Sequence, residues 1–238
     1  ALYGTTPPLD FPKVMEKKEE IIKQLREGVS TLLNQPGINF IKGEAHFVSD
    51  HVVEVNGKRM EAENIIIATG SRSKMPPFMK EEDIRNQPEG EQHIVTSTEL
   101  LSIKEIPQRI TIIGAGVIGM EFASAFAAFG SEVTVIEFMK ECLPPVDSDI
   151  AKRLRKTLEK RGVTFYMQSA VRQIITSSGN GQNATTVVFD RKGKEQTVET
   201  DLVLIATGRQ PNVENIGLES AGIEFTPRGI TVDDNMET

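Results

Sequence analysis

The segment Arg109–Glu137, RITIIGAGVIGMEFASAFAAFGSEVTVIE, constrains the fold of this chain more than any other. A β-branched run at Ile110–Ile113 precedes a glycine-rich turn, and an apolar helical pattern then runs as far as Gly130. A second β-branched run, Val133–Ile136, ends on Glu137. Strand, tight turn, helix and strand in this order are typical of an α/β domain that binds a dinucleotide above a parallel sheet.

Each glycine of the turn has a separate physical task. Gly114 allows the sharp strand-to-helix turn, Gly116 lets the backbone approach a pyrophosphate, and Gly119 lets the helix pack closely on the strand. The first turn of the helix offers unpaired N–H groups and the positive end of a dipole to the phosphates. The predicted dinucleotide-binding residues of this turn are Gly114, Ala115, Gly116, Val117, Ile118, Gly119, Met120 and Glu121.

Glu137 indicates which nicotinamide coenzyme is used. A carboxylate at the end of the second strand can accept hydrogen bonds from both ribose hydroxyls of NAD. The 2′-phosphate of NADP would be repelled there, and NADP sites usually supply arginine instead. Residues 138–142, FMKEC, contain no arginine and one lysine, so we predict NAD.

Composition narrows the class of protein. The 238 residues are 38% hydrophobic with a net charge of −7, which fits a globular protein and argues against nucleic-acid binding. No stretch approaches the roughly 18 apolar residues of a membrane span, and the first residues lack a signal-peptide pattern. A single cysteine, Cys142, excludes an internal disulfide and a cysteine zinc site. We therefore expect no metal, no membrane and a cytoplasmic or organelle-matrix location.

Periodicity predicts further elements before the glycine turn. A long amphipathic helix is expected over Pro12–Leu33, capped by Asp10. The β segments and short helix expected after it are strands at Phe40–Ile41, Ala45–Val48, Val52–Val55 and Glu63–Ala68, a hairpin turn at Asn56–Gly57, and a capped helix at Thr96–Leu101.

After Glu137 the pattern predicts a helix, a strand, an antiparallel meander and a final buried strand. These elements are expected at Asp147–Arg161, Val163–Tyr166, Val171–Thr176, Thr185–Asp190, Gln196–Glu199 and Asp201–Ala206, with a polar tip at Ser177–Asn183. The final strand, VLIATGR (203–209), echoes IIIATGS (65–71). Both end in Ala-Thr-Gly, at what is predicted to be the ligand edge of a sheet.

Several motifs together resemble the pyridine nucleotide–disulfide oxidoreductase flavoproteins, and most closely their dihydrolipoamide dehydrogenase branch. They are IKGEAHF (41–47), IIIATGS (65–71), IVTSTELL (94–101), IGAGVIGMEFASAF (113–126), CLPPVDSDI (142–150), IATGRQPNVENIGLESAGIE (205–224) and GITVDDNMET (229–238). The resemblance implies an α/β fold in which a Rossmann-like NAD-binding domain (107–215), with a parallel sheet and a meander, is inserted into a partial FAD-binding domain (1–106). Residues 216–238 would begin the return to the FAD and central domains.

The resemblance also implies site residues. Val171 and Gly208 match positions that line the NAD cleft, and Glu121 matches a glutamate near the flavin–nicotinamide contact. The matches to backbone contacts with FAD are Ala45, Thr69, Gly70 and Ser71. The family's N-terminal FAD fingerprint, its CxxxxC redox pair and its dimerisation domain with a His–Glu pair are absent. We therefore expect an internal, inactive fragment with no catalytic residue.

The resemblance implies a parent enzyme that oxidises dihydrolipoamide on the lipoyl domain of a 2-oxoacid dehydrogenase or glycine cleavage complex, as a homodimer. An NADH oxidase or peroxidase, another flavoprotein disulfide reductase, or a non-enzymatic NAD-sensing module stays open as an alternative. A short-chain dehydrogenase is excluded because it needs Tyr-x-x-x-Lys. Tyr3 and Tyr166 are followed at that spacing by Pro7 and Ala170.

Overall fold

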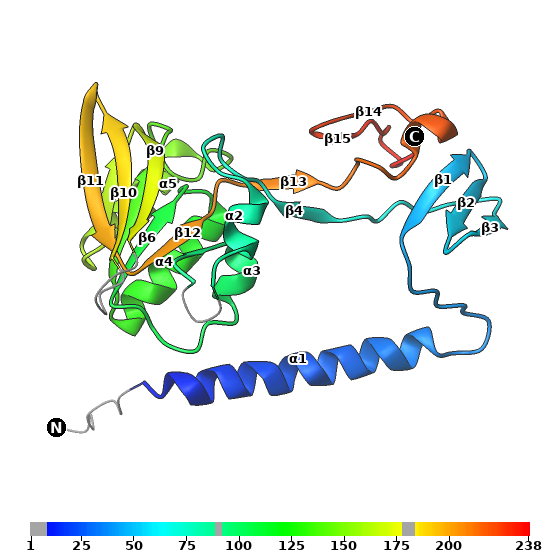
Figure 1. Cartoon of the computed structure of the whole chain (residues 1–238), viewed down its shortest axis with the longest axis horizontal. Helices are drawn as coiled ribbons and strands as arrows, with labels where there is room; N and C mark the ends of the chain where they lie inside the picture. The colour runs from blue at the N-terminus through cyan, green and yellow to red at the C-terminus, as the bar shows by residue number, and fades with distance from the viewer. Residues whose placement is uncertain (1–8, 89–91, 178–183) are drawn as a thin grey trace. The chain divides into compact units, whose positions relative to one another are not determined.

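The computed structural model describes residues 9–88, 92–177 and 184–238 (Figure 1). Contacts divide the chain into two compact units. The first comprises the segment ending at Glu16 together with Ser73–Gly208, and the second comprises Lys17–Arg72 and Arg209–Thr238. The predicted boundaries at residues 106 and 215 concern cofactor-binding domains and stay a prediction.

A five-stranded parallel sheet organises the first unit (Figure 1). The strands, in spatial order, are β5 (Ile94–Val95), β12 (Leu202–Ile205), β6 (Arg109–Ile113), β7 (Glu132–Glu137) and β8 (Thr164–Met167). The three middle strands are almost wholly buried, which explains why they read as continuous apolar runs. The predicted α/β class and the predicted strands of this sheet are confirmed.

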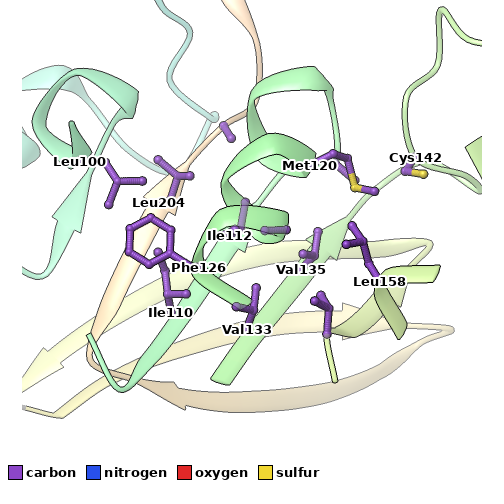
Figure 2. Packing of buried hydrophobic residues seen from close by; sticks show 14 of the residues in the cluster. Leu100, Ile110, Ile112, Met120, Phe126, Val133, Val135, Cys142, Leu158 and Leu204 are labelled. Carbon is purple, nitrogen blue, oxygen red and sulfur yellow. The ribbon is translucent and has the colours of Figure 1, made fainter. Parts of the chain in front are cut away.

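Two helices cover one face of the sheet. They are α4 (Val117–Phe129) and α5 (Ser148–Glu159). Figure 2 shows the buried side chains between α4 and the strands, with Met120 and Phe126 from the helix and Ile110 and Ile112 from β6. Gly130 ends α4 in the left-handed conformation, at φ 96°, as its position in the sequence predicts.

The antiparallel meander covers the opposite face. It consists of β9 (Ser169–Ser177), β10 (Ala184–Arg191) and β11 (Lys194–Thr200). Val187 and Phe189 are two residues apart on β10, so both side chains face the same side of the strand. Both pack against Ile113 of β6. The meander is confirmed, whereas residues 178–183 of its predicted polar tip lie outside the described residues.

A small hairpin sheet lies in the second unit. The hairpin sheet contains β1 (Ala45–Ser49), β2 (Val52–Val55) and β3 (Lys58–Glu61). Asn56 and Gly57 have φ of 52° and 75°, which matches the two-residue hairpin turn predicted from Asn-Gly. The other elements are α1 (Phe11–Leu33), α2 (Glu81–Arg85), α3 (Ser97–Leu100), η1 (Leu218–Ala221), β14 (Phe225–Thr226) and β15 (Gly229–Ile230). No described helix could cross a membrane.

Two predicted helices before the glycine turn are confirmed with their caps. The Lys13 N–H donates to the Asp10 carboxylate at the start of α1. Thr96 and Glu99 form a reciprocal capping box at the start of α3.

Two predicted strands are wrong. The segments Phe40–Ile41 and Glu63–Ala68 are irregular, and Ile66 is 92% exposed. A buried strand needs neighbours that complete its hydrogen bonds and cover both of its faces. Among the described residues no strand pairs with either segment, so their β-branched composition alone does not produce a ladder.

The two Ala-Thr-Gly segments are joined by a short two-stranded ladder. It pairs β4 (Ser71–Ser73) with β13 (Arg209–Pro211). The echo noted in the sequence therefore corresponds to a structural relationship, because the residues after each Ala-Thr-Gly become hydrogen-bonded neighbours.

Candidate functional site

The glycine turn and Glu137 lie together at the carboxyl edge of the parallel sheet. Strands β6 and β7 are paired in register, with Ile113 opposite Ile136. The residues that follow this pair, Gly114 and Glu137, therefore lie at the same edge. The Gly114 N–H donates to the Ile136 carbonyl at 2.9 Å. In open α/β sheets this edge is where ligands bind.

The three glycines meet different surroundings, and those of Gly114 and Gly119 match the tight turn and the close packing predicted from the sequence. A side chain at Gly114 would collide with the Ala206 carbonyl, and φ there is 105°. A side chain at Gly119 would collide with the Gly114 carbonyl. At Gly116 a Cβ atom would meet nothing within 4 Å. Gly114 and Gly119 therefore serve packing, while Gly116 leaves space open at the start of α4.

Glu137 is the acid of this edge, and its carboxylate is already bonded to the backbone. Its Oε2 accepts the Ala115 N–H at 2.5 Å and its Oε1 accepts the Met139 N–H at 2.7 Å. The residue is 8% exposed. A carboxylate has about four acceptor positions, so about two remain for further donors. The geometry leaves capacity for a diol, whereas the two backbone contacts of Glu137 could not be predicted from the sequence.

The loop after Glu137 returns to the glycine turn. The Leu143 N–H donates to the Ala115 carbonyl at 2.8 Å, so both backbone polar groups of Ala115 are bonded to the segment that begins with Glu137. Cys142 and Leu143 are buried in the core with Ala115. Leu143 has φ of 50°, an uncommon value for a residue with a branched side chain.

An arginine absent from the sequence prediction holds this loop. Arg155 of α5 donates from Nε and Nη2 to the two oxygens of Glu141, at 2.7 and 3.0 Å. The hydrogen bonds that Arg155 donates lower the pKa of Glu141 to about 2, and the same bonds raise the pKa of Arg155. Arg155 lies on the next helix, outside the residues directly after Glu137 on which the coenzyme prediction rests.

The other residues predicted to bind NAD occupy varied environments. Val117 and Glu121 are exposed, whereas Met120 fills the core beneath the turn. Gly208 follows β12 at the same sheet edge, has φ of 110° and is exposed. Val171 is half-buried and packs in the layer between the sheet and the meander. Ile118 is half-buried in the first turn of α4. Their roles toward a coenzyme stay predictions.

The residues predicted to contact FAD lie in the second unit. Ala45, Thr69 and Gly70 are exposed. The Thr69 hydroxyl donates to the Asn212 carbonyl at 2.7 Å, and the Asn212 N–H donates to the Gly70 carbonyl at 3.0 Å. The Ser71 hydroxyl accepts from Arg209 Nε. Arg209 and Asn212 are thus partners that the sequence did not identify.

The described part of the chain contains no candidate metal site and one free thiol. No group of His, Cys, Asp and Glu there could hold a metal ion. Cys142 is a free, buried thiol.

Comparison with known proteins assigns the family. Residues 2–238 match the model of the pyridine nucleotide-disulphide oxidoreductases. The chain belongs to this family. It is 35% identical over 229 residues to a dihydrolipoyl dehydrogenase of Acholeplasma laidlawii, covering 96% of this chain and 64% of that protein. A dihydrolipoyl dehydrogenase of Bacillus subtilis is 37% identical over 233 residues, covering 96% of this chain and 47% of that one.

A solved structure gives the same assignment. The HOCl-induced flavoprotein disulfide reductase RclA of Escherichia coli superposes with a TM-score of 0.81 at 34% identity, covering 97% of this chain and 50% of that one. The chain spans about half to two thirds of the length of these relatives. The predicted Rossmann-type fold, the flavoprotein oxidoreductase class and the use of a flavin and a pyridine nucleotide are confirmed at the level of the family.

Proposed function

We propose that this chain is the NAD-binding part of a flavin-dependent dihydrolipoamide dehydrogenase. The observation that carries the proposal is the bond between the Ala115 N–H and the Glu137 carboxylate. It places an acid beside a glycine turn, with acceptor positions to spare, where a dinucleotide would present a diphosphate and a ribose diol. The dihydrolipoyl dehydrogenases among the relatives support the choice of enzyme.

The residues of the turn fit such a coenzyme. The first N–H groups of α4 have no carbonyl partner within the helix and carry the positive end of its dipole. Gly116 leaves open space in front of them, so a diphosphate oxygen could approach the backbone. Glu137 would accept from the adenosine ribose, and its charge would repel a 2′-phosphate. We therefore propose NAD rather than NADP.

The parent enzyme would oxidise dihydrolipoamide through a cysteine pair and a flavin, with NAD⁺ as the final hydride acceptor. This chain would hold the nicotinamide coenzyme in place, with Glu121 exposed on the helix that follows the turn. It contains one cysteine, so it cannot form the redox disulfide by itself and should be inactive alone. A lipoyl domain as substrate carrier, a homodimer, and a cytoplasmic or organelle-matrix location belong to the same proposal.

A second candidate is another flavoprotein disulfide reductase, or an NADH oxidase or peroxidase. It is favoured by the likeness to the E. coli reductase, at an identity close to that of the dihydrolipoyl dehydrogenases. The full-length parent would distinguish these activities. NAD⁺ reduction by dihydrolipoamide supports the first proposal, whereas turnover of NADH with oxygen or peroxide alone supports the second.

Coenzyme binding by the chain itself is tested by calorimetric titration with NADH and NADPH. We expect NADH to bind at least about tenfold more tightly, which corresponds to about 1.4 kcal/mol. Equal affinities would contradict the role of Glu137, and no binding of either coenzyme would contradict the proposal as a whole.

A further inference from the structure

We propose that Arg155 is a positioning residue for the coenzyme site, acting through Glu141 on the backbone of the glycine turn. The inference rests on the proposed NAD-binding function and assigns it a residue on a different element, helix α5. Arg155 does not belong to the turn, to β7 or to the loop that follows β7. Its effect on the coenzyme would therefore be transmitted by the loop that it holds.

The first link is the ion pair itself. Arg155 meets Glu141 with two parallel N–H···O bonds, of 2.7 and 3.0 Å, and both side chains are largely buried, at 17% and 23% exposure. A planar guanidinium that binds a carboxylate in this way fixes orientation as well as distance. Glu159, one turn along α5, also accepts from Arg155 and holds the guanidinium from its other side.

The second link runs from Glu141 to the core. Its Oε1 also accepts the N–H of the next residue, Cys142, at 3.0 Å. The Cys142 thiol donates to the Ala151 carbonyl of α5 at 3.4 Å. The loop is thus attached to α5 at two successive residues, which leaves little freedom for Leu143.

The third link reaches the coenzyme turn. The Leu143 N–H donates to the Ala115 carbonyl, while the Ala115 N–H donates to Glu137. Ala115 lies between the glycine that makes the turn and the glycine that leaves space for a diphosphate. A shift of the loop at Leu143 therefore moves the peptide units that the coenzyme would contact.

The test compares NADH dissociation constants of the 238-residue chain and its variants. Arg155→Gln and Glu141→Gln should each weaken NADH binding about tenfold, and the double variant should bind no worse than either single one, because both break the same link. Arg155→Lys keeps the charge but loses the two-pronged geometry, so it should fall between wild type and Arg155→Gln.

A matched control separates positioning from a general loss of stability. Asp201 accepts Arg109 Nε and Nη2 at 3.2 and 2.6 Å, with the pair about one third exposed, at the amino end of β6. Asp201→Asn breaks a comparable ion pair of the same unit at the opposite edge of the sheet. It should lower the melting temperature while changing the NADH dissociation constant less than twofold.

A measurement without coenzyme completes the test. Hydrogen exchange in the free chain should become faster at the amides of Ala115 and Leu143 in Arg155→Gln but not in Asp201→Asn. Unchanged exchange and unchanged NADH affinity in Arg155→Gln would overturn the inference while leaving the proposed function intact. Absence of NADH binding to the wild-type chain would overturn both, and additive losses in the double variant would overturn the relay through Glu141.

Discussion

The Ala115 N–H donates to the Glu137 carboxylate, so a hydrogen bond within the protein joins the glycine turn to the end of β7. The two residues lie on different elements and are joined where the diphosphate and the ribose of a dinucleotide would meet. A site that is already ordered loses less entropy when its ligand binds. We therefore expect this bond to affect both stability and coenzyme preference, and the two effects can be separated by substitution.

Glu137→Gln and Glu137→Ala should differ in a graded way. The amide keeps one acceptor oxygen for either Ala115 or Met139, whereas alanine leaves both N–H groups without this partner. We expect Glu137→Ala to lower the free energy of unfolding by about 1–3 kcal/mol and Glu137→Gln by less. Both should reduce the preference for NADH over NADPH. Urea unfolding and calorimetric titration measure the two effects, and an unchanged coenzyme ratio in both variants would contradict the assignment.

Gly119→Ala and Gly116→Ala should affect different properties. The methyl group at residue 119 would collide with the Gly114 carbonyl, so we expect a loss of about 1–3 kcal/mol in unfolding free energy. The methyl group at residue 116 meets open space at an ordinary φ of −72°, and the cost should be about 1 kcal/mol or less. Gly116→Ala should instead weaken NADH binding about tenfold because the methyl group occupies the path of the diphosphate. The reverse pattern would contradict both roles.

Acid should remove the stabilisation that the Glu141–Arg155 ion pair gives to the folded state. Hydrogen bonds from Arg155 lower the pKa of Glu141 from 4.5 to about 2, so the folded state binds its proton less readily than the unfolded chain. The stabilisation is complete well above pH 4.5, decreases as the pH falls below it, and is lost near pH 2. The difference in unfolding free energy between wild type and Glu141→Gln should shrink across this range. A difference that stays constant with pH would show that the pair contributes no ionic stabilisation.

Cys142 should be inert toward thiol reagents in the folded chain. Burial, with a smaller effect from Glu141, raises its pKa to about 11, so almost no thiolate is present at pH 8. We expect the Cys142 thiol to react with a chromogenic disulfide at pH 8 at least about a hundredfold faster in denaturant than in buffer, since both ionisation and access are then restored. Equal rates would show that the loop opens readily.

Flavin should not be retained by this chain. The predicted backbone contacts with FAD are few, and the Gly70 carbonyl already accepts the Asn212 N–H. After incubation with FAD and gel filtration, we expect no stoichiometric flavin absorbance. A yellow complex that survives the column would contradict the prediction, and free FAD eluted in parallel is the control.

The strands and turns of the first unit could be predicted from the sequence because their signals are local. The Ile110–Ile113 run, the glycine turn and Gly130 each specify backbone geometry within a few residues, and all three agree with the structure. The two-residue turn at Asn56–Gly57 is equally local and equally accurate. Positive φ at glycine and the alternation of side chains along a strand can be predicted without information on distant residues.

The errors and omissions arise where partners are distant in sequence. The segment around Ile66 has strand composition, but a strand requires neighbours, and composition does not reveal them. Arg155 was missed because a salt bridge from the next helix leaves no pattern at the loop that it holds. The bond between Thr69 and Asn212 spans 143 residues, and only the repeated Ala-Thr-Gly hinted at it.

The two ends of the Ser73–Gly208 segment of the first unit meet. The Lys74 N–H donates to the Gly208 carbonyl at 3.0 Å, and the Thr207 hydroxyl donates to the Lys74 carbonyl at 2.6 Å. A gene segment encoding residues 73–208 could therefore be cut out and grafted into a host loop with closely spaced attachment points, as inserted domains often are. Phe11, which packs edge-on against Phe129, would be left behind, so the grafted cassette would need a new apolar side chain to shield that ring.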